Sequence, residues 1–366
     1  MNDINGRISR RGFVSGAAAV AAAGALGGIG RAQTAKAAES ASSTADKKAS
    51  SSKAETPAPV PGGPSQGIVR VSVSVNDLER SRSFFTNFLE FTPMACGMLS
   101  ADEVKGLYGL GGGARYVMLQ NAWQNTLVQL IEFDARTGKN IRTGRDSWDP
   151  GYFDVAMRCD DNKAVRDHLV KLGYTYYCEP HEYTTEWSGS TVSEAVACGV
   201  DDMPLTLIET VSEPRPEFEG LFKNVTDVAQ CVSDVDRADE FYGQCLGLSK
   251  VYDEEVVGLV DAILSLPENT PTRIAMYSVP NTPVVELLQI GLDGKPMSDV
   301  AKPENAGLFS TSFEVDDLGG VLATCEEKGF AAHGEPVKVF LAPYGTIETV
   351  LVDGPDGMLV ELFRRA

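Results

Sequence analysis

Hydrophobic and polar residues alternate where the first foldable segment of the chain begins. The apolar positions of this segment are Val69, Val71, Val73 and Val75. A period of two is typical of a strand with one buried face. An aspartate follows, and then apolar residues recur at the three- and four-residue spacings of a helix with one buried face: Leu78, Phe84, Phe85, Phe88 and Leu89. Three further strand-like runs come next, so the pattern predicts a βαβββ module.

The same pattern recurs along the chain. Residues 225–248 match residues 68–91 at an offset of 157, and residues 307–330 match residues 151–174 at an offset of 156. Near the two ends, PLTLIET matches LVELFRR at an offset of 155. The aligned pairs include Asp77 with Asp234, Phe84 with Phe241, Gln129 with Glu286, Gly173 with Gly329, and Thr206 with Glu361. Repeats of this kind indicate a duplicated unit. We therefore predict an α+β fold of four βαβββ modules.

The N-terminal 66 residues have a different composition. Arg10 and Arg11 precede Phe13 and an apolar stretch of mostly Ala and Gly, and Ala35-Lys36-Ala37 has the small-x-small form of a cleavage site. This segment resembles a twin-arginine signal peptide, so residues 1–37 are expected to be removed on export to the periplasm or beyond. The apolar run is shorter than the ~20 residues that span a bilayer, so no stable membrane anchor is expected. Residues 38–66, rich in Ala, Ser, Lys and Pro, predict a disordered linker.

Charge and composition exclude several classes of function. The chain carries a formal net charge of −19, and removal of residues 1–37 would leave −23. A nucleic-acid partner is therefore not expected, because such proteins need a positive surface. Only three histidines occur in 366 residues, which is a poor supply for a typical zinc or non-haem iron site. The seven cysteines are an odd number, and the sequence leaves open whether Cys178 and Cys198 pair across strands.

The modules resemble the vicinal oxygen chelate (VOC) superfamily, which includes glyoxalase I, bleomycin-resistance proteins and extradiol dioxygenases. The resemblance covers nearly all of residues 67–366 and is strongest in 225–248 and in 351–363, where a DGPDG turn precedes the strand MLVELF. It implies two tandem VOC domains, residues 67–212 and 222–366, each an incomplete barrel of eight strands around a cavity. Such a shared fold does not fix the chemistry.

The resemblance also implies which residues face each cavity. Family ligands lie on the first and last strands of each module, and these positions in the N-terminal half are Arg70, Gln129, Asp154 and Thr206. We expect these four to bind the ligand. Arg70 stands where a metal ligand is usual, and either recognises an anionic ligand or forms an ion pair with Asp154.

The corresponding positions in the C-terminal half are Asp227, Glu286, Ser310 and Glu361. Three converging carboxylates must be protonated, solvated or neutralised. A metal held by these four residues would be a hard ion such as Mg²⁺, Mn²⁺ or Ca²⁺ rather than zinc, with Glu286 or Glu361 as a catalytic base. Arg273 could instead pair with one of the acids.

Two functions follow from these expectations. The first is an exported protein that binds a small organic molecule in its cavity, without proven catalysis. The alternative is a lyase, isomerase or dioxygenase that uses an oxygen-liganded divalent metal on a substrate with vicinal oxygens. His181, on a loop beside Trp187, is the histidine most suited to acid–base chemistry. The substrate, the cofactor and the oligomeric state stay open.

Overall fold

The computed structural model describes residues 64–121, 124–184, 189–212 and 221–366. The predicted signal peptide, and the predicted linker up to residue 63, lie outside these ranges. Among the described residues, no helix is both long and apolar enough to cross a membrane. Each module contains the predicted strand, helix and three further strands, so the α+β fold of four βαβββ modules is confirmed.

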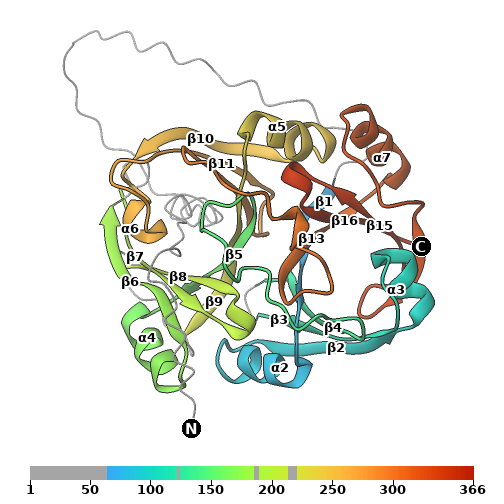
Figure 1. The fold of residues 1–366 in the computed structure, drawn as a ribbon, viewed down its shortest axis with the longest axis horizontal. Helices are drawn as coiled ribbons and strands as arrows, with labels where there is room; N and C mark the ends of the chain where they lie inside the picture. Colours follow the sequence, from blue (N-terminus) through green and yellow to red (C-terminus); the bar gives the residue numbers. More distant parts are fainter. Residues whose placement is uncertain (1–63, 122–123, 185–188, 213–220) are drawn as a thin grey trace, which may run out of the picture.

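The sixteen strands form two sheets of eight (Figure 1). One sheet, here the 1–4 sheet, joins the first and fourth modules in the order β14 (Val337–Leu341), β15 (Gly345–Asp353), β16 (Leu359–Arg365), β13 (Gly307–Val315), β1 (Pro64–Ser74), β4 (Leu127–Phe133), β3 (Ala114–Gln120), β2 (Thr92–Leu99). The other, here the 2–3 sheet, joins the second and third in the order β10 (Ser249–Val257), β11 (Pro271–Ser278), β12 (Val284–Ile290), β9 (Phe222–Cys231), β5 (Gly151–Cys159), β8 (Pro204–Thr210), β7 (Thr191–Cys198), β6 (Thr175–Thr184).

The expected pairing of consecutive modules within one sheet is therefore wrong. The first strands of the modules pair antiparallel at the centre of each sheet, β1 with β13 and β9 with β5. Neither predicted half, 67–212 or 222–366, forms a sheet of its own. The connections between modules explain this, because residues 134–150 and 291–306 both cross from one sheet to the other. These two connections lie side by side, with Ile141 N donating to the carbonyl of Ala306 at 2.8 Å.

Consecutive modules meet through their helices instead. The helices are α2 (Leu78–Asn87), α3 (Ala101–Tyr108), α4 (Asn162–Lys171), α5 (Val235–Asp239), the π-helical turn η2 (Glu240–Cys245), α6 (Asp261–Leu264) and α7 (Leu318–Glu327), with 3₁₀ turns η1 (Val200–Asp202), η3 (Met297–Asp299) and η4 (Pro355–Gly357). In Figure 1, α2 lies near α4 and α5 lies near α7. The ring of Phe88 on α2 stacks on His168 of α4 at 5.1 Å. Phe241 of η2 contacts Phe330, just after α7, at 4.9 Å.

An aspartate begins the first helix of every module. The side chains of Asp77 and Asp234 each accept hydrogen bonds from two backbone amides, at the starts of α2 and α5. Those of Asp161 and Asp317 each accept from one backbone amide, at the starts of α4 and α7. A side-chain oxygen at this position satisfies amides that have no partner within the helix. The repeated aspartate therefore fixes where the strand turns into the helix in all four modules.

Each sheet curls around a core of its own. One core joins residues from both ends of the 1–4 sheet, such as Leu99 on β2 and Leu341 on β14, with α3 between them. In the 2–3 sheet, Cys178 and Val196 at one end pack with Ile263 of α6, and α6 also packs against the β11–β12 end. Side chains on the inner face of either sheet are consequently enclosed.

Candidate functional site

The eight ligand positions inferred from the family all lie on central strands, but the structure groups them differently. The 1–4 sheet carries Arg70, Gln129, Ser310 and Glu361 on β1, β4, β13 and β16. The 2–3 sheet carries Asp154, Thr206, Asp227 and Glu286 on β5, β8, β9 and β12. The two predicted groups of four are thus each split between the sheets. In particular, Ser310 and Glu361 do not join Asp227 and Glu286.

Inside the 1–4 sheet, Arg70 forms a buried ion pair with Glu361. The predicted pair with Asp154 is wrong, since Asp154 belongs to the other sheet. Burial alone would lower the pKa of Arg70, but the carboxylate of Glu361 outweighs it and raises that pKa. Glu361 also accepts hydrogen bonds from Thr349 at 2.7 Å and Ser312 at 3.2 Å. Every charge at these positions of the 1–4 sheet therefore has a partner.

Apolar side chains fill the rest of this interior. Tyr108 of α3 contacts the rings of Phe133 at 5.0 Å and Phe309 at 6.1 Å. The guanidinium of Arg70 lies over the rings of Tyr344 at 5.4 Å and Phe363 at 5.7 Å. The side chain of Gln129 accepts a hydrogen bond from Ser72 at 3.0 Å. The interior of the 1–4 sheet thus surrounds one buried ion pair with apolar and aromatic side chains.

Inside the 2–3 sheet, acidic side chains gather without a matching cation at the ligand positions. Asp154, Asp227 and Glu286 are fully buried, and Glu194 on β7 is buried with them. Thr206 donates a hydrogen bond to Asp154. Thr226 donates to Asp227 at 2.7 Å and Tyr183 donates to Glu194 at 2.6 Å. Among the described contacts, a hydroxyl group thus donates to each of Asp154, Asp227 and Glu194.

Burial and mutual repulsion change the protonation of this cluster. Burial, together with the charge of Asp154, raises the pKa of Asp227 well above its usual range. Burial, together with the charges of Asp227 and Asp154, raises the pKa of Glu286 in the same way. The proximity of the two carboxyl groups raises the pKa of Glu286 further and opposes the rise at Asp227.

The carboxyl group of Glu286 lacks hydrogen-bond partners. Among the described residues, no group donates a hydrogen bond to either of its oxygens or to Oδ1 of Asp227. Buried polar atoms are nearly always satisfied in folded proteins. The unsatisfied atoms at the ligand positions of the 2–3 sheet are therefore mostly acceptors, whereas those at the same positions of the 1–4 sheet, Nε and Nη1 of Arg70 and Nε2 of Gln129, are donors.

The sequence reasoning missed two members of this cluster, Glu194 and Tyr183. A signal for Glu194 was present in the repeat, because the 155-residue offset aligns it with Thr349, which contacts Glu361 in the other sheet. The repeat thus marks this strand position as facing the interior in both sheets. Tyr183 lies on β6, where bulges between Tyr176 and His181 break the alternation that would have shown its direction.

The donor set of this cluster bears on whether a divalent metal could bind. Its atoms are all oxygen, which suits Mg²⁺, Mn²⁺ or Ca²⁺ better than zinc. However, no three His, Cys, Asp or Glu side chains in the described part of the chain stand close enough together to share an ion. The predicted set is also divided, because Ser310 and Glu361 lie in the 1–4 sheet. In this conformation the residues do not fit a metal centre.

Three other candidates from the sequence lie elsewhere. His181 is exposed on β6 and stacks on Tyr183 with ring centroids 6.3 Å apart, while its neighbour Trp187 lies outside the described residues. Arg273 pairs at the surface with Asp253 at 2.8 Å and Asp236 at 2.9 Å, not with a cavity acid. Cys178 and Cys198 are free thiols.

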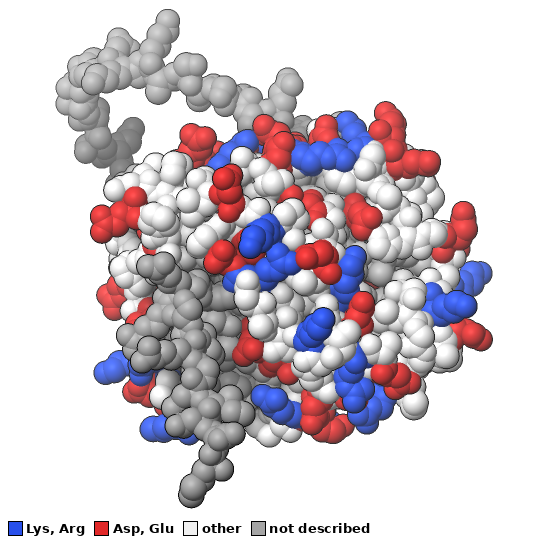
Figure 2. All heavy atoms as spheres, in the orientation of Figure 1, with Lys and Arg blue, Asp and Glu red and all other residues white. Residues whose placement is uncertain are grey.

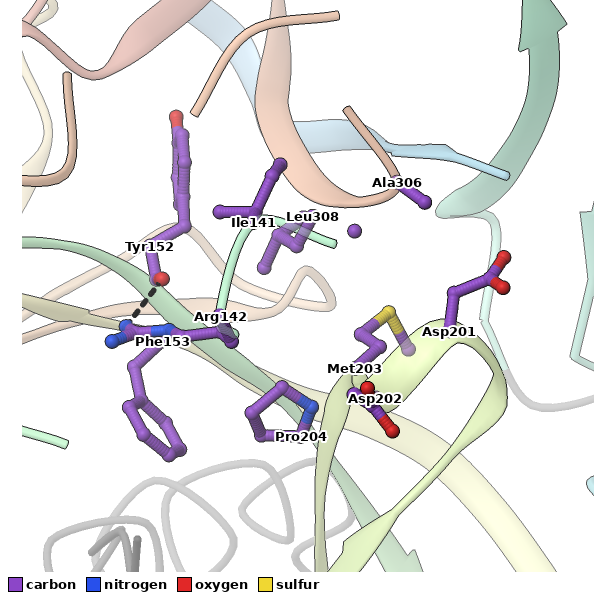
Figure 3. A pocket seen from close by; sticks show the side chains of 11 residues that line it. Ile141, Arg142, Tyr152, Phe153, Asp201, Asp202, Met203, Pro204, Ala306 and Leu308 are labelled. Atoms are coloured by element: carbon purple, nitrogen blue, oxygen red, sulfur yellow. Dashed lines mark hydrogen bonds between the residues drawn. The ribbon is translucent and has the colours of Figure 1, made fainter. Parts of the chain in front are cut away.

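The described residues line two hollows, and Val69 and Leu127 of the inner core of the 1–4 sheet border the larger one. A cleft of about 500 Å³ opens at the end of the 1–4 sheet, between Tyr344, Arg365 and the loop 279–282. A much smaller hollow of about 10 Å³ lies where the sheets meet (Figure 3). There the guanidinium of Arg142 donates to the carbonyl of Tyr152 at 2.6 Å. Its size admits about one water molecule, so it is not a ligand site.

The surface shows no strong separation of charge on the face seen in Figure 2. Acidic and basic side chains alternate over this face rather than forming one patch. The face in Figure 2 therefore has no positively charged patch of the kind that binds a nucleic acid, and the net charge of the chain is −19. The surface charges on this face are thus evenly mixed, and the distinctive ionisable groups of the described residues are the buried ones.

Comparisons with known proteins agree with this architecture. Residues 224–362 match the family model of the Glyoxalase/Bleomycin resistance protein/Dioxygenase superfamily. Among solved structures, glyoxalase I from Zea mays is similar with a TM-score of 0.57 and 17% identity, covering 81% of this chain and 92% of that one. A mutant of the same enzyme gives a TM-score of 0.55 at 16% identity, covering 81% and 93%. No curated protein matches. Residues 224–362 are thus similar to this superfamily, and the likeness to the solved structures concerns the fold.

Proposed function

We propose that this chain is an exported VOC protein that binds a small organic molecule inside the 2–3 sheet. The observation that carries the proposal is the cluster of buried carboxyl groups around Asp227 and Glu286, whose pKa values are raised by burial and by their neighbours. Burying acids without cations costs free energy. Perturbed acids at the ligand positions of a fold are typical of functional sites.

The chemistry of the cluster selects the kind of ligand. Asp227 Oδ1 and the carboxyl oxygens of Glu286 offer hydrogen-bond acceptors, so the ligand should present hydroxyl, amide or ammonium donors. Apolar side chains on the same core, Ile274, Met276 and Leu288, would contact its carbon skeleton. A few polar groups on an apolar wall are the usual composition of a small-molecule site.

The alternative is the oxygen-liganded divalent-metal enzyme acting on a substrate with vicinal oxygens. The all-oxygen donor set favours it, and Asp154, Asp227 and Glu286 would be the residues that hold the ion. The arrangement of the described side chains does not favour it, because no three of them are positioned to share one ion. We therefore place small-molecule binding first.

Export rests on the N-terminal sequence. Arg10-Arg11 and Ala35-Lys36-Ala37 support cleavage after residue 37 and a periplasmic or secreted protein. N-terminal sequencing of protein recovered outside the cytoplasm should give Ala38 as the first residue. Recovery of the uncleaved chain in the cytoplasm alone would contradict export.

A thermal-shift panel tests the binding proposal. The purified protein is screened at pH 6 with catechols, 2-oxo aldehydes, polyols and small amines, each with and without Mg²⁺, Mn²⁺ or Ca²⁺. A ligand at about 100 times its Kd adds about 2.7 kcal/mol to the free energy of unfolding, which is a clear rise in Tm. A rise with an organic donor alone supports binding, and a rise that needs the metal supports the alternative. No rise with any compound contradicts both.

A further inference from the structure

Two of the seven cysteines meet where the third and fourth modules pack together. Cys245 ends the π-helical turn η2, Cys325 lies in α7, and both side chains are buried in the same core. The residues beside them also touch, because Lys328 Nζ donates to the side chain of Gln244 at 2.8 Å. The contact between η2 and α7 therefore holds the two thiols at a fixed place.

The repeat offers an internal comparison for this pair. At offsets of 157 and 156, Cys245 aligns with Phe88 and Cys325 with Leu169. These two residues are buried in the corresponding contact between α2 and α4. Apolar packing is thus sufficient at this place in the fold, yet the second half of the chain has a thiol at both positions. Two thiols at one contact between helices can form a disulfide bond, which the side chains of Phe88 and Leu169 cannot.

The two thiols are close enough to affect each other's ionisation. A hydrogen bond with Cys325 lowers the pKa of Cys245, and the nearby charges of Lys328 and Arg237 lower it further. The same hydrogen bond raises the pKa of Cys325. One sulfur is thus suited to be the attacking thiolate and the other to be the resolving thiol.

We propose that Cys245 and Cys325 are a redox modification site, and that oxidation joins them in a disulfide between the third and fourth modules. Both cysteines are free thiols in the structure described above. The oxidant is a small-molecule disulfide, of which oxidised glutathione is the simplest example. The 2–3 sheet would then be covalently joined to the 1–4 sheet at the helix layer.

The reaction proceeds in two balanced steps. The thiolate of Cys245 attacks one sulfur of the small-molecule disulfide, forming a mixed disulfide and releasing one thiolate. The sulfur of Cys325, having lost its proton to water, then attacks the sulfur of Cys245 and releases the second thiolate. The protein loses two protons and two electrons, and the small molecule takes up two electrons as two thiols. Local opening of the short helix α7 admits the oxidant.

Peptide mapping of the full chain is the direct test. The protein is treated with oxidised glutathione, both folded and during refolding from urea, then alkylated and digested without reductant. We expect a cross-linked peptide pair containing Cys245 and Cys325, a loss of two titratable thiols, and reversal by dithiothreitol. The bond closes a loop of about 80 residues, so Tm should rise by roughly 5 °C or more.

Matched variants make the result specific. Cys245→Ser and Cys325→Ser should each abolish the cross-link and the rise in Tm, while Cys159→Ser, which removes another buried thiol, should keep both. The mapping of the unaltered chain stands even if a variant fails to fold. Absence of the cross-linked pair under both oxidising conditions, or its replacement by glutathione adducts or by other cysteine pairs, would overturn the proposal.

Discussion

Replacing Glu286 by Gln is expected to raise the free energy of unfolding at pH 8 by about 2 kcal/mol. The side chain is fully buried beside Asp227, and burial together with that carboxylate raises its pKa well above the usual range. Folding therefore forces Glu286 to keep a proton that it would lose in the unfolded chain. An amide of the same shape avoids this cost. Residues retained for binding at the expense of stability commonly behave in this way.

The sign of this effect depends on pH. Because the folded-state pKa is raised, the folded protein binds more protons than the unfolded chain above the ordinary Glu value of 4.5. The contribution of this carboxyl group to the stability of the wild type should be greatest below that pH and should fall as pH rises toward the raised pKa. The gain from Glu286→Gln should accordingly shrink toward zero near pH 4.

Urea denaturation from pH 4 to pH 8 measures both quantities. Glu255→Gln, an exposed carboxylate on β10, is the matched control and should change stability by less than about 0.5 kcal/mol. A loss of stability in Glu286→Gln at pH 8, or a gain that does not grow between pH 4 and pH 8, would show that the buried acid does not destabilise the fold. Either result would remove the reason for treating it as a ligand site.

Glu361→Ala should have the largest effect of opposite sign, a loss of about 3–5 kcal/mol. Arg70 is fully buried, and Glu361 is its ion-pair partner. Without the carboxylate, a guanidinium would remain inside the 1–4 sheet with no compensating charge. The double variant Arg70→Met/Glu361→Leu removes both charges and should recover most of the loss, because apolar pairs often replace buried ion pairs without cost.

Chemical denaturation of the single and double variants checks this prediction. Glu314→Ala is the matched control in the same sheet, since Glu314 pairs with Arg365 at 2.9 Å near the surface. Such exposed pairs contribute at most about 1 kcal/mol. Equal losses for Glu361→Ala and Glu314→Ala would contradict the buried pair. A double variant as unstable as the single one would mean that the loss comes from packing.

Much of the fold was accessible from the sequence. Alternating valines, the helix-capping aspartates and the constant offsets gave four modules, and all four are present. The eight positions inferred from the family resemblance, among them Arg70 and Glu286, are all buried, and their role in binding stays a prediction. These features depend on local periodicity, which each module expresses by itself.

The pairing of the modules could not be predicted in the same way. All four begin with equivalent strands, so pairing β1 with β13 or with β5 satisfies the same alternation. The path of the connections 134–150 and 291–306 between the sheets decides the outcome, and nothing in their composition gives that path. Because the pairing was missed, the charges were matched wrongly: Arg70 neutralises Glu361, which leaves Asp154 with Asp227 and Glu286.

The central claim is that the 2–3 sheet holds the ligand and the 1–4 sheet does not. Gln129 and Glu286 occupy equivalent positions of the repeat, so Gln129→Met and Glu286→Gln form a matched pair. The direct measurement is the Tm shift that the strongest compound of the panel gives with each variant. We predict that the shift is retained in Gln129→Met and lost in Glu286→Gln. Loss in Gln129→Met with retention in Glu286→Gln would place the ligand in the other sheet and contradict the account.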